Sequence, residues 1–127
     1  MNAYIVEDDD DMRFILKRSL KKNFPSFTHI YESATAEVAL NEICELKPEL
    51  ALIDISLPGM DGIELIKRIR PCCKTICILV VTGHELDLYR KSALETGADN
   101  IISKANSDEL IKIIRELLQK DNHCGCN

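Results

Sequence analysis

The sequence predicts an α/β fold of the doubly wound kind, in which a five-stranded parallel β-sheet is covered by helices on both faces, in the order (βα)5. Short apolar segments alternate with amphipathic segments along all 127 residues, the order that builds a parallel sheet through right-handed crossovers. Two of the apolar segments, Leu50–Ile53 and Ile76–Val81, are almost continuously apolar, as is typical of strands buried on both faces. The length of the chain suits a single domain.

Five segments are expected to form the strands. The first is apolar and is followed at once by acidic residues, while the second is the least apolar of the five. The last is short and lies between two amphipathic segments. In chain order the expected strands are Ala3–Val6, Thr28–Tyr31, Leu50–Ile53, Ile76–Val81 and Asn100–Ser103.

Apolar residues between and after these segments recur at intervals of three and four, which predicts five helices. The clearest stripe is the last, and Asn106 with Glu109 three residues further on is expected to cap the start of that helix. The five stripes lie within Met12–Leu20, Val38–Leu46, Ile63–Ile69, Leu86–Ala93 and Leu110–Leu118.

Turn-forming residues separate these segments. Lys47-Pro48 ends a helix before a strand, Leu57-Pro58-Gly59 is expected to form a turn, and Gly97 follows the fourth helix in the position of a C-terminal cap. No repeat, linker or low-complexity segment is present in the sequence. Residues 1–121 are therefore expected to form one domain, and residues 122–127 a disordered C-terminal tail.

The charge and hydropathy of the chain argue against two classes of partner. The formal net charge is −5 and no basic stripe stands out, so direct binding of nucleic acid by this chain is not expected. No apolar run approaches the roughly 20 residues that span a bilayer, and residues 1–4 do not resemble a signal peptide. We therefore expect a cytoplasmic protein with no membrane partner.

The six cysteines do not form two CxxC pairs, and a disulfide scaffold is not expected in a cytosolic chain of this size. Cys44 and Cys77 lie in apolar segments and are expected to be small core residues. The segment His123-Cys124-Gly125-Cys126 offers soft metal ligands, but too few for a structural zinc site. We expect it to belong to a frayed tail.

Polar residues of complementary chemistry follow four of the expected strands. The acidic run Glu7 to Asp11 follows the first strand, Asp54 follows the third, Thr82 the fourth and Lys104 the fifth. Ligands of a doubly wound sheet bind at the carboxyl ends of the strands, so these residues are expected to meet at one edge. Each alone has an ordinary explanation, as a solvated loop, a turn or a surface amine; their combination indicates a site.

The chemistry of such a site follows from its charges. Several carboxylates within a few ångströms repel one another, and a hard divalent cation such as Mg²⁺ relieves that repulsion by binding their oxygens. A lysine at the same point adds a second compact positive charge. A carboxylate beside both charges can act as a nucleophile toward phosphorus and form an acyl phosphate. The cation and the ammonium group then offset the charge of the transferred oxygens.

Four stretches of the sequence resemble the signature segments of response-regulator receiver domains, the phosphoproteins of two-component signalling. They are residues 4–13, 50–62, 78–83 and 101–104, and the block Leu57-Pro58-Gly59-Met60-Asp61-Gly62 after Asp54 is specific to this family. The resemblance covers essentially the whole chain and extends to the single-domain regulators of the chemotaxis type. It implies a flavodoxin-like receiver fold and a switch in a phosphorelay, not a metabolic enzyme.

The resemblance implies a Mg²⁺ site. Glu7 and Asp8 match the acidic pair that binds the metal in receiver domains, and Asp54 is a further ligand. Ser56 lies two residues after Asp54, where the family supplies a backbone carbonyl to the metal.

The resemblance also implies how a phosphoryl group is accepted and how the signal leaves. Asp54 matches the phosphoacceptor, Thr82 the hydroxyl residue that holds the phosphoryl group and Lys104 the lysine that pairs with it. The implied donor is a histidine kinase or a phosphotransfer protein, and the implied receiver of the signal is a downstream protein or an output domain. The expected readout face runs from Leu86 through Leu118, the fourth helix, fifth strand and fifth helix, which can also support a homodimer.

The sequence departs from the family pattern at three positions. Glu7 stands where Asp is commoner, Ala105 where most members have a proline in a cis bond, and Ile101 where a switch aromatic is usual. A cis bond before a residue other than proline costs about 3 kcal/mol, so a trans bond or a rearranged loop is expected at Ala105. His84, two residues after Thr82, is expected either to influence the water that hydrolyses the phosphoryl group or to be an exposed loop residue.

Two other functional classes remain open: an enzyme, either haloacid-dehalogenase-like or flavodoxin-like, and a pseudo-receiver. A haloacid-dehalogenase-like enzyme also uses an Asp nucleophile with Mg²⁺, but it needs a second Asp where this chain has Ser56. A flavin-binding protein would need a phosphate-binding loop after the first strand, and that loop is acidic here. A pseudo-receiver would keep the fold as a binding module without phosphorylation; Ile101 and Ala105 favour it, and the complete set of site residues argues against it.

Overall fold

The computed structural model describes residues 1–83 and 86–124, with side chains as far as residue 119. Strands and helices alternate throughout this part of the chain, so the predicted fold class is confirmed. In chain order they are β1 (Asn2–Val6), α1 (Asp10–Asn23), β2 (His29–Ser33), α2 (Ala36–Leu46), β3 (Leu50–Ile53), α3 (Gly62–Ile69), β4 (Cys77–Thr82), α4 (Leu86–Thr96), β5 (Asn100–Ser103) and α5 (Ser107–Cys124).

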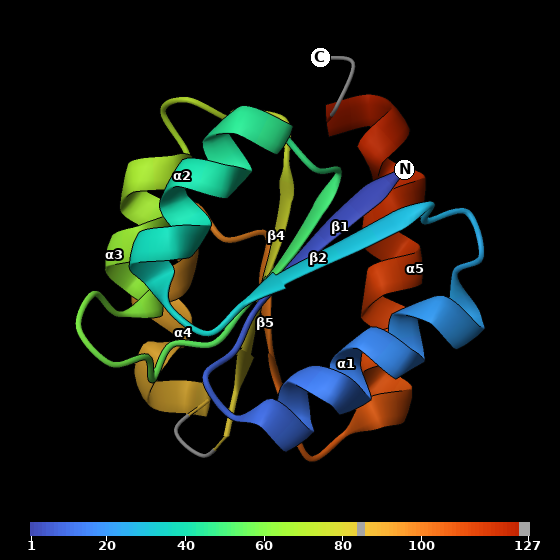
Figure 1. Ribbon diagram of the computed structural model, residues 1–127, viewed down its shortest axis with the longest axis horizontal. Coiled ribbons are helices and arrows are strands. Elements are labelled where there is room, and N and C mark those ends of the chain that lie inside the picture. The colour runs from blue at the N-terminus through green and yellow to red at the C-terminus, as the bar shows by residue number, and fades with distance from the viewer. Residues whose placement is uncertain (84–85, 125–127) are drawn as a thin grey trace.

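The five strands form one parallel sheet in the order β2-β1-β3-β4-β5. Helices α2, α3 and α4 lie on one face of this sheet, and α1 and α5 lie on the other (Figure 1). Strand order reverses between β1 and β3, because the chain first adds β2 on one side of β1 and then returns to add β3 on the other. Parallel sheets of this kind bind ligands at that reversal, beyond the carboxyl ends of the two strands.

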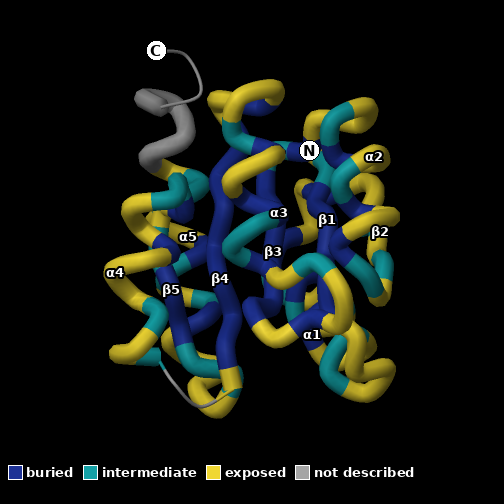
Figure 2. The backbone as a smooth tube through the Cα atoms, turned by 90° about the vertical axis from the view of Figure 1, so that its left-hand side faces the viewer, coloured by how far each residue is buried: buried dark blue, intermediate teal, exposed yellow. Residues whose placement is uncertain are grey.

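Apolar side chains fill both faces of the sheet. Strands β3 and β4 are buried along their whole length (Figure 2), as their continuous apolar sequences predicted. One apolar cluster lies under α2, α3 and α4 and includes Ile43, Ile66 and Ile78. The other lies under α1 and α5 and includes Leu20 and Leu79. Each face therefore has its own layer of buried side chains, and successive strand residues alternate between the layers.

The predicted helix ends are confirmed in their chemistry. The side-chain oxygen of Asn106 accepts a hydrogen bond from the backbone N–H of Glu109 at 3.0 Å, which caps the start of α5 as predicted, and the side-chain amide of Asn106 donates to the Glu109 carboxylate at 3.0 Å. Gly97 has a φ of +130°, which glycine adopts without the strain that a side chain would bring. Lys47 ends α2 with a φ of +49°. Strand β2 begins one residue later than expected, at His29.

Helix α5 runs from Ser107 to Cys124, so its backbone passes the expected domain boundary at residue 121. That boundary and the disorder of the tail stay predictions, because the side chains after residue 119 and the backbone after residue 124 lie outside the described part. Among the described helices, none is long and apolar enough to cross a membrane.

The cysteines correct one expectation. Cys44 and Cys72 form a disulfide, although no disulfide was expected and Cys44 was expected to be a core residue. The prediction failed because residues 28 apart in sequence meet only when α2 and α3 pack side by side, which cysteine spacing does not reveal. Cys77 is buried on β4 as expected. The side chains of the motif at residues 123–126 lie outside the described residues.

Gly62 is expected to be intolerant of a side chain, although it opens helix α3, where Ala would normally be favoured. A Cβ atom at this position would lie 2.3 Å from the backbone oxygen of Asp54. We expect Gly62→Ala to lower the free energy of unfolding by about 2 kcal/mol or more, measured by urea denaturation. Gly83→Ala is the control, because no heavy atom lies within 4 Å of its added Cβ, and a change within about 0.5 kcal/mol is expected. Equal stabilities of the two variants would contradict the steric argument.

Candidate functional site

The predicted site residues meet at the reversal of strand order. Val6 at the end of β1 pairs with Ile53 at the end of β3, so the residues that follow these two strands emerge side by side. Glu7 follows the first of them and Asp54 the second, and the N–H of Asp54 donates to the carbonyl of Val6 at 3.0 Å. Two carboxylates that are 47 positions apart in the sequence are thereby fixed next to each other by the sheet register.

The ammonium group of Lys104 lies between these carboxylates. Its Nζ is 2.6 Å from Oε1 of Glu7 and 3.1 Å from Oδ2 of Asp54. The side chain of Glu7 is 1% exposed and that of Asp54 is 4% exposed, so both ion pairs are largely shielded from water. Lys104 follows β5, and its backbone N–H donates to the carbonyl of Thr82 at 2.8 Å, which fixes the lysine relative to β4.

Thr82 and Ser56 complete the predicted set. Thr82 ends β4 and is 3% exposed. Ser56 follows β3, and its backbone N–H donates to Oδ1 of Asp54 at 3.2 Å. Together with Glu7 and Lys104 these residues line one open cavity of about 430 Å³, whose full lining is Glu7, Asp8, Asp9, Asp54, Ser56, Thr82, Gly83 and Lys104.

The burial of Glu7 changes its acidity. Desolvation by burial raises the pKa of Glu7 from 4.5 to about 7; the contact with the ammonium group of Lys104 opposes this in part, and the nearby charge of Asp54 raises the pKa further. Burial alone would lower the pKa of Lys104, but its contacts with Glu7 and Asp54 outweigh burial and raise it. Lys104 is therefore firmly cationic, and it neutralises one of the two carboxylates that it contacts.

The acidic residues fit a divalent cation. Oxygen atoms of Glu7, Asp8 and Asp54 lie within 4.8 Å of one another, so a single ion can reach all three side chains. Oε1 of Glu7 is buried and, despite its close ion pair with Lys104, receives no hydrogen bond of suitable geometry. Carboxylate oxygens are the ligands of hard cations such as Mg²⁺ and Ca²⁺. A cation here would supply the positive charge that one lysine cannot supply to three carboxylates.

The structure also shows where two residues that depart from the receiver pattern, Ile101 and Ala105, lie. Ile101 is 2% exposed on β5 and pairs in register with Val80. The described peptide bonds contain no cis bond, so the bond before Ala105 is trans, as expected. His84 lies outside the described residues.

One contact near the site was not anticipated from the sequence. The carboxylate of Glu37, on α2, accepts the backbone N–H of Met60 at 3.0 Å and so holds the loop that follows Asp54. Glu37 lies 23 residues from Met60 and in an ordinary polar helix position, so no local pattern indicated this contact.

A larger groove of about 700 Å³ lies elsewhere, along α1, and is lined by Phe14 and by mostly basic side chains. Two of these, Arg13 and Lys17, pair with Glu32 at 3.0 Å and 2.7 Å. The charges of this groove are partly exposed to water, whereas the smaller cavity gathers buried carboxylates at the reversal of strand order. We therefore assign the candidate site to the smaller cavity.

Comparison with known proteins points to one family. The sequence model described as response regulator receiver domain matches residues 3–115. A cyclic di-GMP phosphodiesterase from Thermotoga maritima is 34% identical over 113 residues, which cover 89% of this chain and 29% of that protein. The response regulator MprA from Mycobacterium avium is 30% identical over 121 residues, which cover 94% of this chain and 52% of that protein. The chain thus spans about half, or less, of the length of these curated relatives.

Solved structures agree over the full fold. A putative response regulator from Chloroflexus aurantiacus superposes with a TM-score of 0.83 at 30% identity, covering 93% of this chain and 97% of that one. A CheY-like response regulator receiver domain protein from Methanospirillum hungatei superposes with a TM-score of 0.85 at 31% identity, covering 96% of each chain.

The raised pKa of Glu7 predicts a pH dependence of stability in a buffer that contains a chelator of divalent cations. Glu7 keeps its proton up to about pH 7 in the folded chain and only to about pH 4.5 in the unfolded chain. Unfolding between these values releases a proton, so the free energy of unfolding falls as the pH rises from about 4.5 to 7. We expect Glu7→Gln to remove about 2 kcal/mol of this fall, measured by urea denaturation at several pH values.

Glu45→Gln, which changes an exposed glutamate on α2, is the matched control and should keep the wild-type pH profile. Parallel profiles for the wild type and Glu7→Gln would show that Glu7 does not titrate in this range.

Proposed function

Since the chain belongs to the response regulator receiver family, we propose that it accepts a phosphoryl group on Asp54 with Mg²⁺ and signals through a conformational change. The observation that carries this proposal is the contact of Lys104 with two buried carboxylates, Glu7 and Asp54, at the reversal of strand order. The proposed donor is a histidine kinase or a phosphotransfer protein, and the proposed compartment is the cytoplasm. The transfer is directed to the chain itself, and we propose no small-molecule substrate.

Asp54 is the proposed nucleophile. The ammonium group of Lys104 holds one of its oxygens at 3.1 Å, and the N–H of Ser56 holds the other at 3.2 Å, so the carboxylate is oriented before the donor arrives. Its attack on the phosphorus of a phosphohistidine forms an acyl phosphate, and the electrons of the broken phosphorus–nitrogen bond return to the imidazole. Because the carboxylate is already oriented, less entropy is lost on reaching the transition state, which lowers the activation free energy of transfer.

The remaining site residues are proposed to offset the negative charge of the transferred phosphoryl group and to hold the acyl phosphate that forms on Asp54. Glu7, Asp8 and Asp54 are the proposed side-chain ligands of Mg²⁺, and Ser56 is the proposed source of a backbone carbonyl ligand. When bound there, Mg²⁺ supplies positive charge to the oxygens of the transferred group. Lys104 supplies a second positive charge and is proposed to exchange its contact with Asp54 for one with the phosphoryl group. The hydroxyl of Thr82 is proposed to donate a hydrogen bond to a phosphoryl oxygen.

The signal is proposed to leave through α4, β5 and α5. Thr82 is the side chain that is proposed to change position when Asp54 is phosphorylated. Ile101 is not proposed to respond, because it is buried and carries neither a ring nor a hydroxyl. The face offers apolar contacts for a partner or a second copy, since Leu88 is 67% exposed and Leu94 is 41% exposed on α4. A downstream protein, an output domain or a homodimer is the proposed receiver of the signal.

The name of the Thermotoga relative does not extend phosphodiesterase activity to this chain, because the similarity covers only 29% of that protein. The similarity to MprA likewise covers only 52% of that protein. The activity of a longer regulator of this kind is therefore not part of the proposed function.

The acceptor is tested by incubating the full chain with Mg²⁺ and acetyl phosphate and measuring its intact mass. We expect one added phosphoryl group, which base should remove, because acyl phosphates are labile to base. Asp54→Asn should abolish the addition, since the nucleophile is lost. Asp11→Asn, which changes an exposed acid of the same acidic run, is the control and should be labelled like the wild type. Label mapped to Asp9, Asp10 or Asp11 would refute the assignment.

The metal ligands are tested by titrating the chain with Mg²⁺ in a calorimeter. Asp8→Asn replaces a charged ligand by a neutral one, so we expect Mg²⁺ affinity to fall roughly tenfold or more, about 1.4 kcal/mol. The rate of phosphorylation by acetyl phosphate should fall with it. Asp11→Asn again provides the control. Unchanged affinity in Asp8→Asn would remove Asp8 from the site while leaving the role of Asp54 intact.

A further inference from the structure

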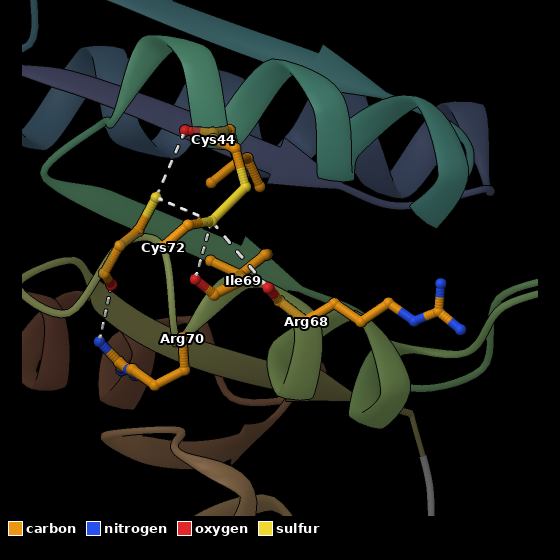
Figure 3. Close-up of a disulfide and its surroundings, with 7 residues drawn as sticks. Cys44, Arg68, Ile69, Arg70 and Cys72 are labelled. Carbon is orange, nitrogen blue, oxygen red and sulfur yellow. Dashed lines mark hydrogen bonds between the residues drawn. A yellow bond between two sulfur atoms is a disulfide. The ribbon is translucent and has the colours of Figure 1, made fainter.

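Three cysteines meet at the end of the sheet opposite the proposed phosphorylation site, between α2 and the segment that follows α3. Cys44, near the end of α2, is bonded to Cys72 (Figure 3). The sulfur of Cys73 lies 3.8 Å from that of Cys72, and the three sulfurs lie within 4.8 Å of one another. The proposed function uses none of these residues.

The bridge is not needed to bring the two helices together. Ile43 of α2 and Ile69 of α3 are fully buried in the same apolar cluster, and Cys73 is packed there with 5% exposure. The length of the chain also gives it a sizeable core, whereas disulfide staples are typical of small secreted domains. The helices therefore pack through apolar contacts, and the disulfide is an addition to an interface that already exists.

The bridge is open to small molecules in solution, and its reduced form has a place in the same structure. Cys72 is exposed and Cys44 is half-buried, so a thiol or a disulfide of low molecular weight can reach the sulfurs. The sulfur of Cys72 lies 3.2 Å from the carbonyl oxygen of Ile69, which can accept an S–H hydrogen bond once the bridge is opened. The reduced thiol of Cys72 therefore has a hydrogen-bond acceptor beside it in the bridged structure.

Cys73, unlike Cys72 and Cys44, is not accessible to small molecules in solution. Its sulfur is buried and lies 3.8 Å from the carbonyl oxygen of Ile43. Burial raises the pKa of the Cys73 thiol, and the nearby charges of Lys47 and Arg70 offset this only in part. The thiolate is the reactive form of cysteine, so burial and the raised pKa both lower the reactivity of Cys73.

We propose that Cys44 and Cys72 form a reversible redox pair, which glutathione disulfide closes and glutathione opens. In the closing reaction the thiolate of Cys72 attacks one sulfur of glutathione disulfide, forms a mixed disulfide and releases one glutathione. The thiolate of Cys44 then attacks the sulfur of Cys72, forms the Cys44–Cys72 bond and releases the second glutathione. The two cysteines lose two electrons and two protons, and glutathione disulfide gains them.

The closed pair joins α2 covalently to the segment that follows α3. Its effect can extend toward the phosphorylation site, because α2 also carries Glu37, which holds the loop after Asp54 through Met60. The bridge closes a loop of 28 residues in sequence, which removes conformations from the unfolded chain. We expect the closed form to melt on the order of 10 °C above the open form in a thermal scan.

The test equilibrates the full chain, without oxygen, in glutathione buffers that run from fully reducing to fully oxidising. Remaining thiols are trapped with N-ethylmaleimide, and the intact mass counts them. Trypsin separates Cys44 from Cys72 by cutting after Lys67 and Arg68, and fragmentation of the linked peptides between the adjacent Cys72 and Cys73 identifies the pair. We expect two more maleimide groups at the reducing end than at the oxidising end, both on Cys44 and Cys72, with a midpoint inside the range.

Variants separate this pair from the other cysteines. Cys72→Ser should remove the redox-dependent change of mass and melting temperature, whereas the neighbouring Cys73→Ala should keep both. A further variant, with Cys124→Ser and Cys126→Ser together, shows that the change does not come from the C-terminal cysteines. Should Cys72→Ser fail to fold, the peptide map of the wild type still identifies the pair.

Three results would overturn the proposal. The first is a pair that stays closed in fully reduced glutathione, which would make the bridge a permanent structural link. The second is the absence of a Cys44–Cys72 bond in glutathione disulfide, whether both thiols stay reduced or Cys44 bonds to Cys73 instead. The third is one Zn²⁺ retained by the reduced chain on the three cysteines and protecting them from oxidation, which would make the cluster a metal site.

Discussion

The architecture of this site depends on the burial of two like charges at one point. Glu7 and Asp54 are almost fully removed from water, and each would repel the other if both were ionised without a counter-charge. The ammonium group of Lys104 contacts both, so it offsets part of the repulsion and of the lost hydration. Removing water from the carboxylates also strengthens every interaction that they make. An uncharged group of the same size would pack more easily there, and it could neither bind a cation nor attack phosphorus.

The fold keeps these charges in place through several weak constraints, most of them in the backbone. The register of β1 with β3 sets Glu7 beside Asp54, and the hydrogen bond from Lys104 N–H to the Thr82 carbonyl sets the lysine beside them. Gly62 lets the start of α3 approach the carbonyl of Asp54 more closely than any side chain would allow. These constraints come from four strand ends and one helix start, so no single element contains the site, and its geometry is a property of the whole sheet.

Most of the fold, and the convergence of the predicted residues at one edge of the sheet, followed from the sequence, because both depend on local order along the chain. Buried parallel strands such as Leu50–Ile53 are apolar throughout, and the residues that follow such strands must share one edge. The sequence could not predict which residues far apart in the chain contact one another. The contact of Glu37 with Met60, the raised pKa of Glu7 and the Cys44–Cys72 bond each depend on how helices and loops pack, and helix packing leaves no spacing rule in the sequence.

The position of Lys104 has a consequence for how the chain is made. A cluster of carboxylates that required a metal ion to fold would tie the yield of protein to the supply of that metal at the moment of synthesis. Here the chain carries its own counter-ion, 50 residues downstream of Asp54, and the charge is neutralised in part as soon as β5 joins the sheet. Under the proposed function, a bound cation can therefore leave the site while the carboxylates keep one counter-charge of their own.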